Sequence, residues 1–247
     1  MSFIKCKYLE LPPWKLEAKE LIEFESGIRV HKLFIPSYIN RIRTCFLLLN
    51  DDEKKRANNY LHQKDSQRFI IARGMLKILA SQYLGIPSVE VEITIGANKK
   101  PFIKSQSSLK LDYNISHSGN WIVMAFGIGS IGIDVEQIQK EFNFESLLPV
   151  CFSSSEQSFI QNNSNSSELF YRLWTRKESF VKATSIGLVE TLPQLICLDG
   201  ESELLNYFSL GQSWETWSFP LDHEHVASLS FVEGKKNILF IEQDIAI

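Results

Sequence analysis

Hydrophobic and polar residues follow two different periods along the chain, and the periods mark its elements. Apolar residues three or four positions apart predict helices over residues 51–62 and 64–84. Asp51 is placed to cap the first helix, and Gly85 followed by Pro87 is placed to end the second. Alternation with a period of two is typical of strands. The strands predicted in this way span residues 89–95, 109–115, 121–126 and 131–136.

The same succession of elements returns in the rest of the chain. Helices are predicted over residues 153–161 and 167–184, and strands over residues 214–219, 225–231 and 238–241. Helices followed by strands, twice over, predict an α+β fold. We expect two similar α+β halves, related by a pseudo-twofold axis, with the active site in the cleft between them. The expected boundary divides the chain into residues 1–128 and residues 129–247.

Composition is ordinary for a globular protein with a hydrophobic core: 44% of the 247 residues are hydrophobic and 22% are charged. The four cysteines are scattered without a CxxC spacing, so a disulfide framework or a zinc site is not expected and a reducing compartment fits. No signal-peptide pattern and no run of about 18 apolar residues is present. We expect a cytoplasmic protein with no membrane partner.

Charge is distributed unevenly, although the net charge is only −3. Residues 1–128 carry 19 Lys and Arg against 12 Asp and Glu, and residues 129–247 carry 7 against 17. Either these are two solvated faces, or a basic half binds an anionic ligand and an acidic half supplies carboxylates to a metal ion. Basic and aromatic residues are not interleaved, so no nucleic-acid partner is expected.

Two short stretches carry the candidate chemistry. Asp134 and Glu136 lie two apart in a strand-like run, so their side chains share one face. Glu178 and Lys182 lie one helical turn apart and also share a face, although such a pair is often only a surface ion pair. If the two faces meet, each pair of carboxylates about 4 Å apart would cost roughly 1–4 kcal/mol. A divalent cation would remove that cost, and Mg²⁺ prefers carboxylates together with substrate phosphates. The pattern therefore predicts chemistry on a phosphate.

Two other patterns are weaker. Residues 127–132 match GxGxxG, but the next residues are strand-like rather than helical, so a hairpin turn is expected in place of a dinucleotide site. His223 and His225 lie two apart without a third ligand, and we expect both to be surface residues.

Three motifs in order give the chain a family resemblance. They are Asp112–Trp121 (DYNISHSGNW), Gly132–Glu136 (GIDVE) and Trp174–Lys182 (WTRKESFVK). The chain resembles the 4′-phosphopantetheinyl transferases of the surfactin-synthetase-activating type over roughly residues 51–190. The resemblance implies an enzyme that moves the phosphopantetheine arm of coenzyme A onto a serine of an apo carrier protein and releases adenosine 3′,5′-bisphosphate. Peptidyl and acyl carrier domains of nonribosomal peptide or polyketide biosynthesis are the implied partners.

The resemblance also implies roles for single residues. Asp134, Glu136 and Glu178 would hold Mg²⁺ against the pyrophosphate of coenzyme A. Glu178 would serve in catalysis as well, by taking the serine proton, and Lys182 would neutralise charge in the transition state. The coenzyme A phosphates would be contacted by Arg56, Arg68, Arg73, Lys100, Pro101, Ser116 and His117.

Some of these assignments have ordinary alternatives. Each arginine also fits a solvated helix charge, and His117, expected in a turn, also fits a local hydrogen bond. Lys99 stands where the family often has glycine before Lys100-Pro101. Glu156 fits a carboxylate behind the metal site or a residue of a first helical turn, of which we favour the second. The apolar residues among 138–152 fit a carrier-docking surface or a core under a short helix.

Three other functions compete with the transferase. They are a synthase specific for the fatty-acid carrier protein, a catalytically silent carrier-binding protein, and a Mg²⁺-dependent phosphohydrolase acting on coenzyme A. Small members of the superfamily have about half this length and must oligomerise, so a chain of this length is expected to act as a monomer.

Overall fold

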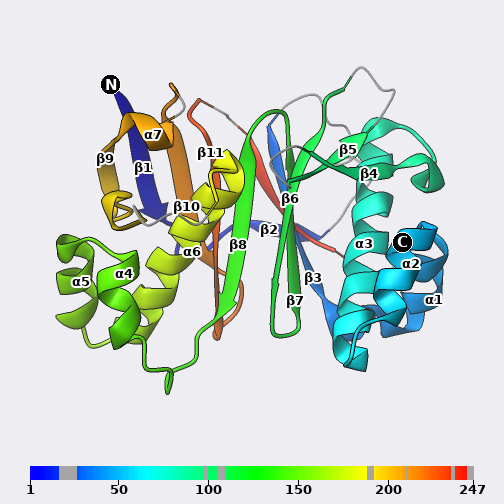
Figure 1. The fold of residues 1–247 in the computed structure, drawn as a ribbon, viewed down its shortest axis with the longest axis horizontal. Helices are drawn as coiled ribbons and strands as arrows, with labels where there is room; N and C mark the ends of the chain where they lie inside the picture. Colours follow the sequence, from blue (N-terminus) through cyan, green and yellow to red (C-terminus); the bar gives the residue numbers. More distant parts are fainter. Residues whose placement is uncertain are drawn as a thin grey trace.

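Two five-stranded sheets lie side by side in the protein, with helices on their outer sides (Figure 1). The computed structural model describes residues 1–16, 27–96, 100–104, 109–187, 192–209, 211–234 and 237–243. In these residues the strands are β1 (Ser2–Tyr8), β2 (Trp14–Leu16), β3 (Ile28–Phe34), β4 (Glu92–Ile95), β5 (Pro101–Lys104), β6 (Asp112–Ser118), β7 (Trp121–Gly127), β8 (Ile131–Gln137), β9 (Gly200–Leu204), β10 (Trp214–Pro220), β11 (His225–Val232) and β12 (Ile238–Glu242).

The helices cover the two sheets separately. They are α1 (Ile42–Leu47), α2 (Asp51–Asn58), α3 (Gln63–Leu84), α4 (Leu148–Cys151), α5 (Ser154–Gln161), α6 (Ser166–Thr184) and α7 (Asn206–Ser209), with 3₁₀ turns at Ile35–Arg41, Ser88–Glu90, Glu145–Leu147 and Leu192–Gln194. In Figure 1, α1 to α3 lie on the right and α4 to α6 on the left. The α+β prediction is confirmed, and the predicted helices and strands are all present, with ends that move by up to four residues.

Each sheet takes one strand from the far end of the chain. The first sheet has the order β8-β11-β10-β1-β9, and the second has the order β2-β12-β3-β7-β6. β1 therefore pairs in parallel with β10 in the sheet of the C-terminal half, and β12 pairs in parallel with β3 in the sheet of the N-terminal half. The pattern of the first 50 residues predicts no strand, so β1, β2 and β3 were not expected. The division at residue 128 stays a prediction, and the sheets depart from it at both termini.

Three hydrophobic clusters hold the layers together. One lies between α3 and the second sheet, and another lies between α6 and the first sheet. The third joins the two sheets, with Val123, Val135 and Leu229 among its fully buried members. Alternate residues of β8 therefore divide between two environments: 131, 133 and 135 enter the cluster between the sheets, and 132, 134 and 136 face α6.

Side chains, and not a backbone ladder, join the two sheets at their edges. Every second residue of β6 takes part. Asp112 accepts the N–H of Gly129 at 2.9 Å, and Asn114 accepts the N–H of Ile133 at 2.8 Å. The other two, Ser116 and Ser118, donate to Asp134 at 2.8 Å and to Glu136 at 3.1 Å. This seam fixes the position of β8 relative to β6.

Three local predictions are corrected. The first predicted helix is capped by Asn50 and not by Asp51, because the Asn50 side chain accepts the N–H of Glu53 while Glu53 accepts the N–H of Asn50. The turn expected around His117 is shorter, because the β6–β7 ladder continues to Ser118 and Trp121. The glycine-rich stretch does join two strands, but these belong to different sheets and so form no hairpin ladder.

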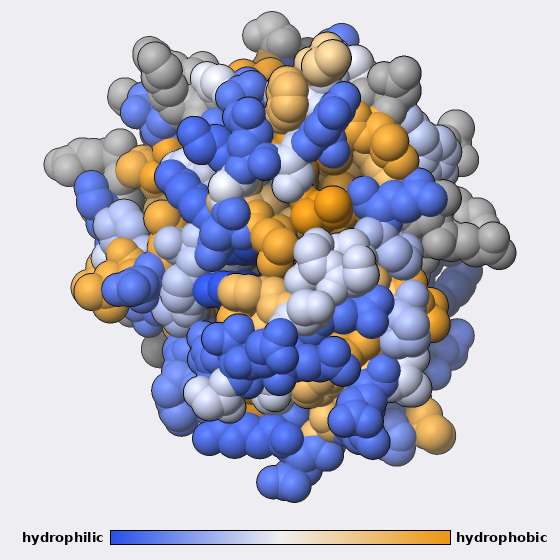
Figure 2. Space-filling view, turned by 90° about the vertical axis from the view of Figure 1, so that its left-hand side faces the viewer, coloured by the Kyte–Doolittle hydropathy of each residue, from blue (hydrophilic) through white to orange (hydrophobic). Residues whose placement is uncertain are grey.

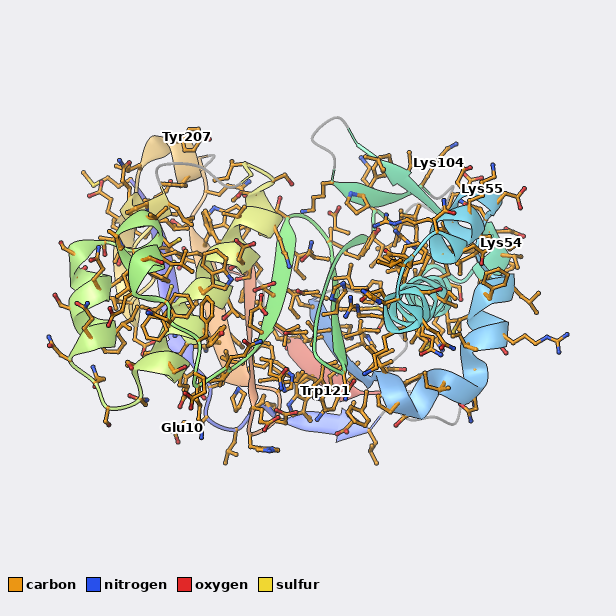
Figure 3. All side chains as sticks on the ribbon, turned by 60° about the horizontal axis from the view of Figure 1, so that its bottom comes forward. Glu10, Lys54, Lys55, Lys104, Trp121 and Tyr207 are labelled. Atoms are coloured by element: carbon orange, nitrogen blue, oxygen red, sulfur yellow. The ribbon has the colours of Figure 1, made fainter. Side chains whose placement is uncertain are left out.

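His225, the first residue of β11, was expected at the surface, and the structure corrects that expectation. His225 is buried, and its Nδ1 lies 2.9 Å from Asp222, which also accepts the indole N–H of Trp121 at 2.7 Å. Gly119, at φ +54°, leaves room for the ring, because a Cβ there would lie 2.8 Å from Nε2 of His225. Trp121 therefore ties the β6–β7 hairpin to the other half, near the middle of the molecule (Figure 3). His223, by contrast, is exposed.

Helix α6 approaches β8 so closely that only glycine fits at position 132. A Cβ at Gly132 would lie 2.0 Å from the carbonyl oxygen of Ser179 and 2.4 Å from the amide nitrogen of Ala183. Both atoms belong to the helix backbone and cannot move aside alone. We expect Gly132→Ala to lower the free energy of unfolding by at least about 2 kcal/mol, measured by urea denaturation, because α6 must shift.

Gly127→Ala is the matched control from the same glycine-rich stretch. The nearest atom to a Cβ at Gly127 is Cδ1 of Ile131 at 3.4 Å, an ordinary packing contact. Its effect should stay within about 1 kcal/mol. Equal destabilisation by the two substitutions would show that close approach at Gly132 is not the cause.

Candidate active site

The face of β8 that carries Asp134 meets the face of α6 that carries Lys182. Lys182 Nζ lies 2.6 Å from Asp134 Oδ1, 3.0 Å from Ser116 Oγ and 3.4 Å from the carbonyl oxygen of Ile133. Ser116 Oγ also donates to the same Asp134 oxygen at 2.8 Å. Asp134 is only 3% exposed, so the ion pair is largely shielded from water. Segments 48 residues apart in the sequence are joined here.

Glu136 and Glu178 lie beside this ion pair. Burial raises the pKa of the Glu136 carboxyl, and the charge of Asp134 raises it further, while Ser118 and Lys182 act against the rise. Burial likewise raises the pKa of Glu178, followed by Asp134, with Lys182 opposing and Glu136 adding to the effect. The three carboxylates therefore interact, as the strand and helix faces predicted.

The donor set fits a divalent cation, but the ligands are not assembled around one point. Carboxylate oxygens are the ligands that Mg²⁺ prefers. Asp134 Oδ2 is buried and has no hydrogen-bond partner, which is costly unless another group binds it. Among the described residues, however, no three His, Cys, Asp or Glu side chains are positioned to hold one ion. The ammonium of Lys182, and not a set of further carboxylates, contacts the other oxygen of Asp134, Oδ1.

A cavity of about 280 Å³ opens next to Lys182, between α2, α3 and β6. Its lining combines apolar side chains such as Phe69 and Ile115 with four cationic ones, those of Arg56, Arg68, Arg73 and Lys182. Arg68 pairs with Asp65 at 2.5 Å, and Arg73 pairs with Glu53 at 3.3 Å. Of the residues predicted to contact phosphate, the structure brings five to this cavity: Arg56, Arg68, Arg73, Ser116 and His117.

His117 lies on strand β6 and not in a turn, since it pairs with Ile122 of β7. Partial burial lowers the pKa of its imidazole most, the charges of Arg68 and Lys182 also lower it, and its own backbone and Asp65 oppose the change. His117 lines the cavity together with Arg68 of α3 and Lys182 of α6. The cavity wall is therefore electropositive where Ser116 and His117 enter it.

Lys100 and Pro101 line a different cavity, of about 350 Å³, at the C-terminal end of α6. Lys100 Nζ donates to the carbonyl oxygens of Ala183 at 3.2 Å and of Ile131 at 3.3 Å. Burial lowers its pKa, and Asp112 opposes that change. The structure therefore does not bring Lys100 to the arginines, and Lys99 lies outside the described residues.

Arg176 and Lys177 of α6, for which the sequence predicts no role, are fully buried. Lys177 Nζ lies 3.0 Å from Glu156 and donates to the carbonyl oxygens of Leu192 and Leu195. Arg176 donates to Ser218, to the carbonyl oxygen of Cys197 and to Asp199. They anchor the helix beneath Glu178.

Glu156 is a capping and ion-pairing residue, which decides between its two readings. It closes a capping box with Ser153 and accepts the N–H of Cys197 at 2.9 Å. The favoured reading, a residue of the first helical turn, is confirmed. The Ser-x-x-Glu spacing in the sequence predicts the capping box. No local sequence pattern predicts the buried ion pair of Glu156 with Lys177.

The apolar residues of 138–152 divide between core and surface. Leu148 is buried and Phe144 stacks on Phe170 at 4.5 Å between ring centroids. Phe142 and Val150 stay 41% and 64% exposed. The core interpretation is confirmed for Leu148 and Phe144, and a carrier-docking surface at the exposed residues stays a prediction.

Fold and site together describe two joined α+β regions, with carboxylates beside a cavity that several cationic side chains line. Comparison with known families agrees. The model of the 4′-phosphopantetheinyl transferase superfamily matches residues 130–238, and a model of the N-terminal part of a 4′-phosphopantetheinyl transferase matches residues 36–128.

Curated relatives carry the same activity in their names. The 4′-phosphopantetheinyl transferase HetI of Nostoc sp. is 30% identical over 181 residues, which cover 72% of this chain and 76% of HetI. The 4′-phosphopantetheinyl transferase gsp of Aneurinibacillus migulanus is 29% identical, covering 62% of this chain and 64% of gsp. Sfp of Bacillus subtilis is 27% identical, covering 57% and 62%. The chain belongs to the 4′-phosphopantetheinyl transferase superfamily, which confirms the resemblance seen in its sequence.

No helix in the described part of the chain combines the length and apolar character needed to cross a membrane.

We expect Lys177→Met to lower the free energy of unfolding by roughly 3–5 kcal/mol, because it leaves Glu156 buried and charged without its partner. Chemical denaturation at pH 7 measures the change. Lys55→Met is the control: Lys55 pairs with Asp52 at the outer surface of α2, where both side chains are more than 70% exposed (Figure 3), and its loss should cost under about 1 kcal/mol. Similar costs for both substitutions would contradict the assignment.

We expect Glu178→Gln to raise the free energy of unfolding at pH 7 by roughly 0.5–2 kcal/mol, although it removes a candidate catalytic residue. Burial and Asp134 raise the pKa of Glu178, so its charged form destabilises the folded state. The gain should be complete above the raised pKa and lost as the pH falls below the ordinary value of 4.5, where the carboxyl is protonated folded or unfolded. Thermal unfolding across pH 4–8 checks this expectation.

Glu168→Gln, in the first turn of the same helix, is the control. A carboxylate there favours the helix N-terminus, so its removal should bring no gain. A gain of equal size at both positions would rule out crowding of carboxylates at Glu178 as the cause.

Proposed function

We propose that this enzyme transfers the 4′-phosphopantetheine arm of coenzyme A to a serine of apo peptidyl or acyl carrier domains and releases adenosine 3′,5′-bisphosphate. Membership of the superfamily gives the reaction class. The observation that carries the proposal is that Asp134, Glu178 and Lys182 meet beside a cavity with cationic walls. Such a site suits the pyrophosphate of coenzyme A, whose phosphorus must be shielded before a hydroxyl can attack it.

The cavity beside Lys182 supports a place for the phosphates of coenzyme A. Arg56 and Arg68 offer charged hydrogen-bond donors there, and guanidinium groups match phosphate oxygens in pairs. His117 adds an imidazole to the same wall. The apolar side chains of Phe69 and Ile115 in the lining would exclude water where they contact the ligand. Lys100 and Pro101, in the neighbouring cavity, would contact the ligand only where it extends along the end of α6.

In the reaction, the serine oxygen forms a bond to phosphorus while the phosphoanhydride bond to adenosine bisphosphate breaks. Glu178 would take the serine proton, since its raised pKa makes it a stronger base than an exposed carboxylate. Lys182 would neutralise the charge that develops on the phosphate oxygens. Ser116 and Ser118 hold Asp134 and Glu136 in place through their hydroxyl groups.

Asp134, Glu136 and Glu178 are the residues that would hold Mg²⁺. The ion supplies Lewis-acid shielding of the pyrophosphate when it is bound. The unpartnered oxygen of Asp134 and the interacting carboxylates support this assignment.

A carrier domain would dock beside the active site on the α4–α6 side of the molecule. Figure 2 shows that face as mostly hydrophilic, with apolar patches between the polar side chains. Phe142 and Val150 supply exposed apolar side chains after β8, the strand that carries the acids. One chain contributes both the cavity and the carboxylates, which supports a monomeric enzyme.

We expect the wild-type protein, incubated with coenzyme A, Mg²⁺ and a panel of apo carrier domains, to add one phosphopantetheine group to a carrier, as measured by mass spectrometry of intact proteins. We expect Asp134→Asn to slow this transfer at least about 100-fold, because the variant loses a charged oxygen that would hold Mg²⁺ against the pyrophosphate. The substitution keeps the size of the side chain, so the protein should stay folded.

Glu215→Gln is the matched control, a carboxylate-to-amide change on β10 of the same sheet whose side chain bonds only to Trp217 among the described contacts. Its transfer rate should equal that of the wild type. Coenzyme A cleavage without a loaded carrier would indicate a hydrolase, and carrier binding without any reaction would indicate a silent binding protein. Either result would overturn the proposal.

A further inference from the structure

All three N–H groups of the Lys182 ammonium are engaged within the protein. An ammonium has three donors and no acceptor. They are directed at Asp134 Oδ1 (2.6 Å), Ser116 Oγ (3.0 Å) and the carbonyl oxygen of Ile133 (3.4 Å). In this arrangement Lys182 has no donor left for a phosphate oxygen, although it borders the cationic cavity.

Only one of the two carboxylate oxygens of Asp134 is bound. Its Oδ1 receives both Lys182 and the hydroxyl of Ser116, while Oδ2 is buried without a partner. The neighbouring Glu136 and Glu178 are both affected by the charges of Asp134 and Lys182. The lysine is therefore the cation that offsets the carboxylates, and it binds the most deeply buried of them.

This arrangement explains why three carboxylates approach one another without forming a set of metal ligands. A divalent cation and the ammonium of Lys182 would compete for the same charge on Asp134, because two cations at one carboxylate repel each other. We propose that Lys182 is the internal cation of the ligand-free site, and that a divalent cation replaces it at Asp134 and so releases the ammonium to the pyrophosphate. This inference rests on the proposed function.

The exchange predicts that Lys182 weakens metal binding when coenzyme A is absent. If the ion pair is open in about one molecule in ten, the apparent Kd for the metal is raised about tenfold. We expect Lys182→Met to bind Mn²⁺, without coenzyme A, at least about tenfold more tightly than the wild type. Titration calorimetry measures the Kd, and the Mn²⁺-induced rise in the thermal unfolding midpoint gives a second readout. Lys182→Gln is a second neutral variant should Lys182→Met fold poorly.

Three variants separate competition at Asp134 from a general loss of positive charge. Lys182→Arg keeps a cation at the position and should stay within about threefold of the wild type. Lys100→Met removes an ammonium that donates to the carbonyl oxygens of Ile131 and Ala183 and makes no described contact with Asp134. Its Kd for Mn²⁺ should therefore also stay within about threefold of the wild type. Adding Asp134→Asn to Lys182→Met should abolish the gain.

An unchanged or weaker Kd in both neutral Lys182 variants overturns the inference, and so does an equal gain in Lys100→Met. The transfer assay on the wild type keeps the two proposals apart. If the wild type loads carriers and the neutral variants show no tighter Mn²⁺ binding, only the cation exchange is wrong. If the wild type loads no carrier, the proposed function fails whatever the Mn²⁺ affinities are.

Discussion

The rest of the site depends on the approach of helix α6 to strand β8 at Gly132. With no side chain at that position, the helix backbone at Ser179 and Ala183 lies directly on the strand. Lys182 can then reach Asp134, and Glu178 comes within electrostatic range of Asp134 and Glu136. A single methyl group between the two elements would separate the charges on which any phosphate chemistry here relies.

Helix α6 is held in that position by buried charge as well as by packing. Lys177 and Glu156 form a fully buried ion pair, and the Arg176 guanidinium is divided among a hydroxyl, a carbonyl and Asp199. Such pairs add little net stability compared with apolar residues, but their geometry is strict because each unpaired group would be costly. The motif from Trp174 to Lys182 therefore combines two structural cations with Glu178 and Lys182, the two residues proposed to act in the transfer.

The two halves are joined at three levels. β1 and β12 cross from one half to the other, the third hydrophobic cluster fills the space between the sheets, and alternate side chains of β6 bond to β8. The seam has a consequence for the site. Ser116 and Ser118 belong to one half and the acids they hold belong to the other, so a shift between the halves would misplace the carboxylates.

Sequence alone determined the elements with a clear period and the pairing of residues within one element. Period-two alternation placed Asp134 and Glu136 on one face, and the helical turn placed Glu178 with Lys182, because both depend only on local geometry. Tertiary structure alone decided that the terminal strands exchange between the halves and that Glu156 pairs with Lys177. It also decided that Lys100 lies apart from the arginines and that Lys182 pairs with Asp134. These contacts join residues far apart in the chain, and no local pattern records which distant partner a buried charge will find.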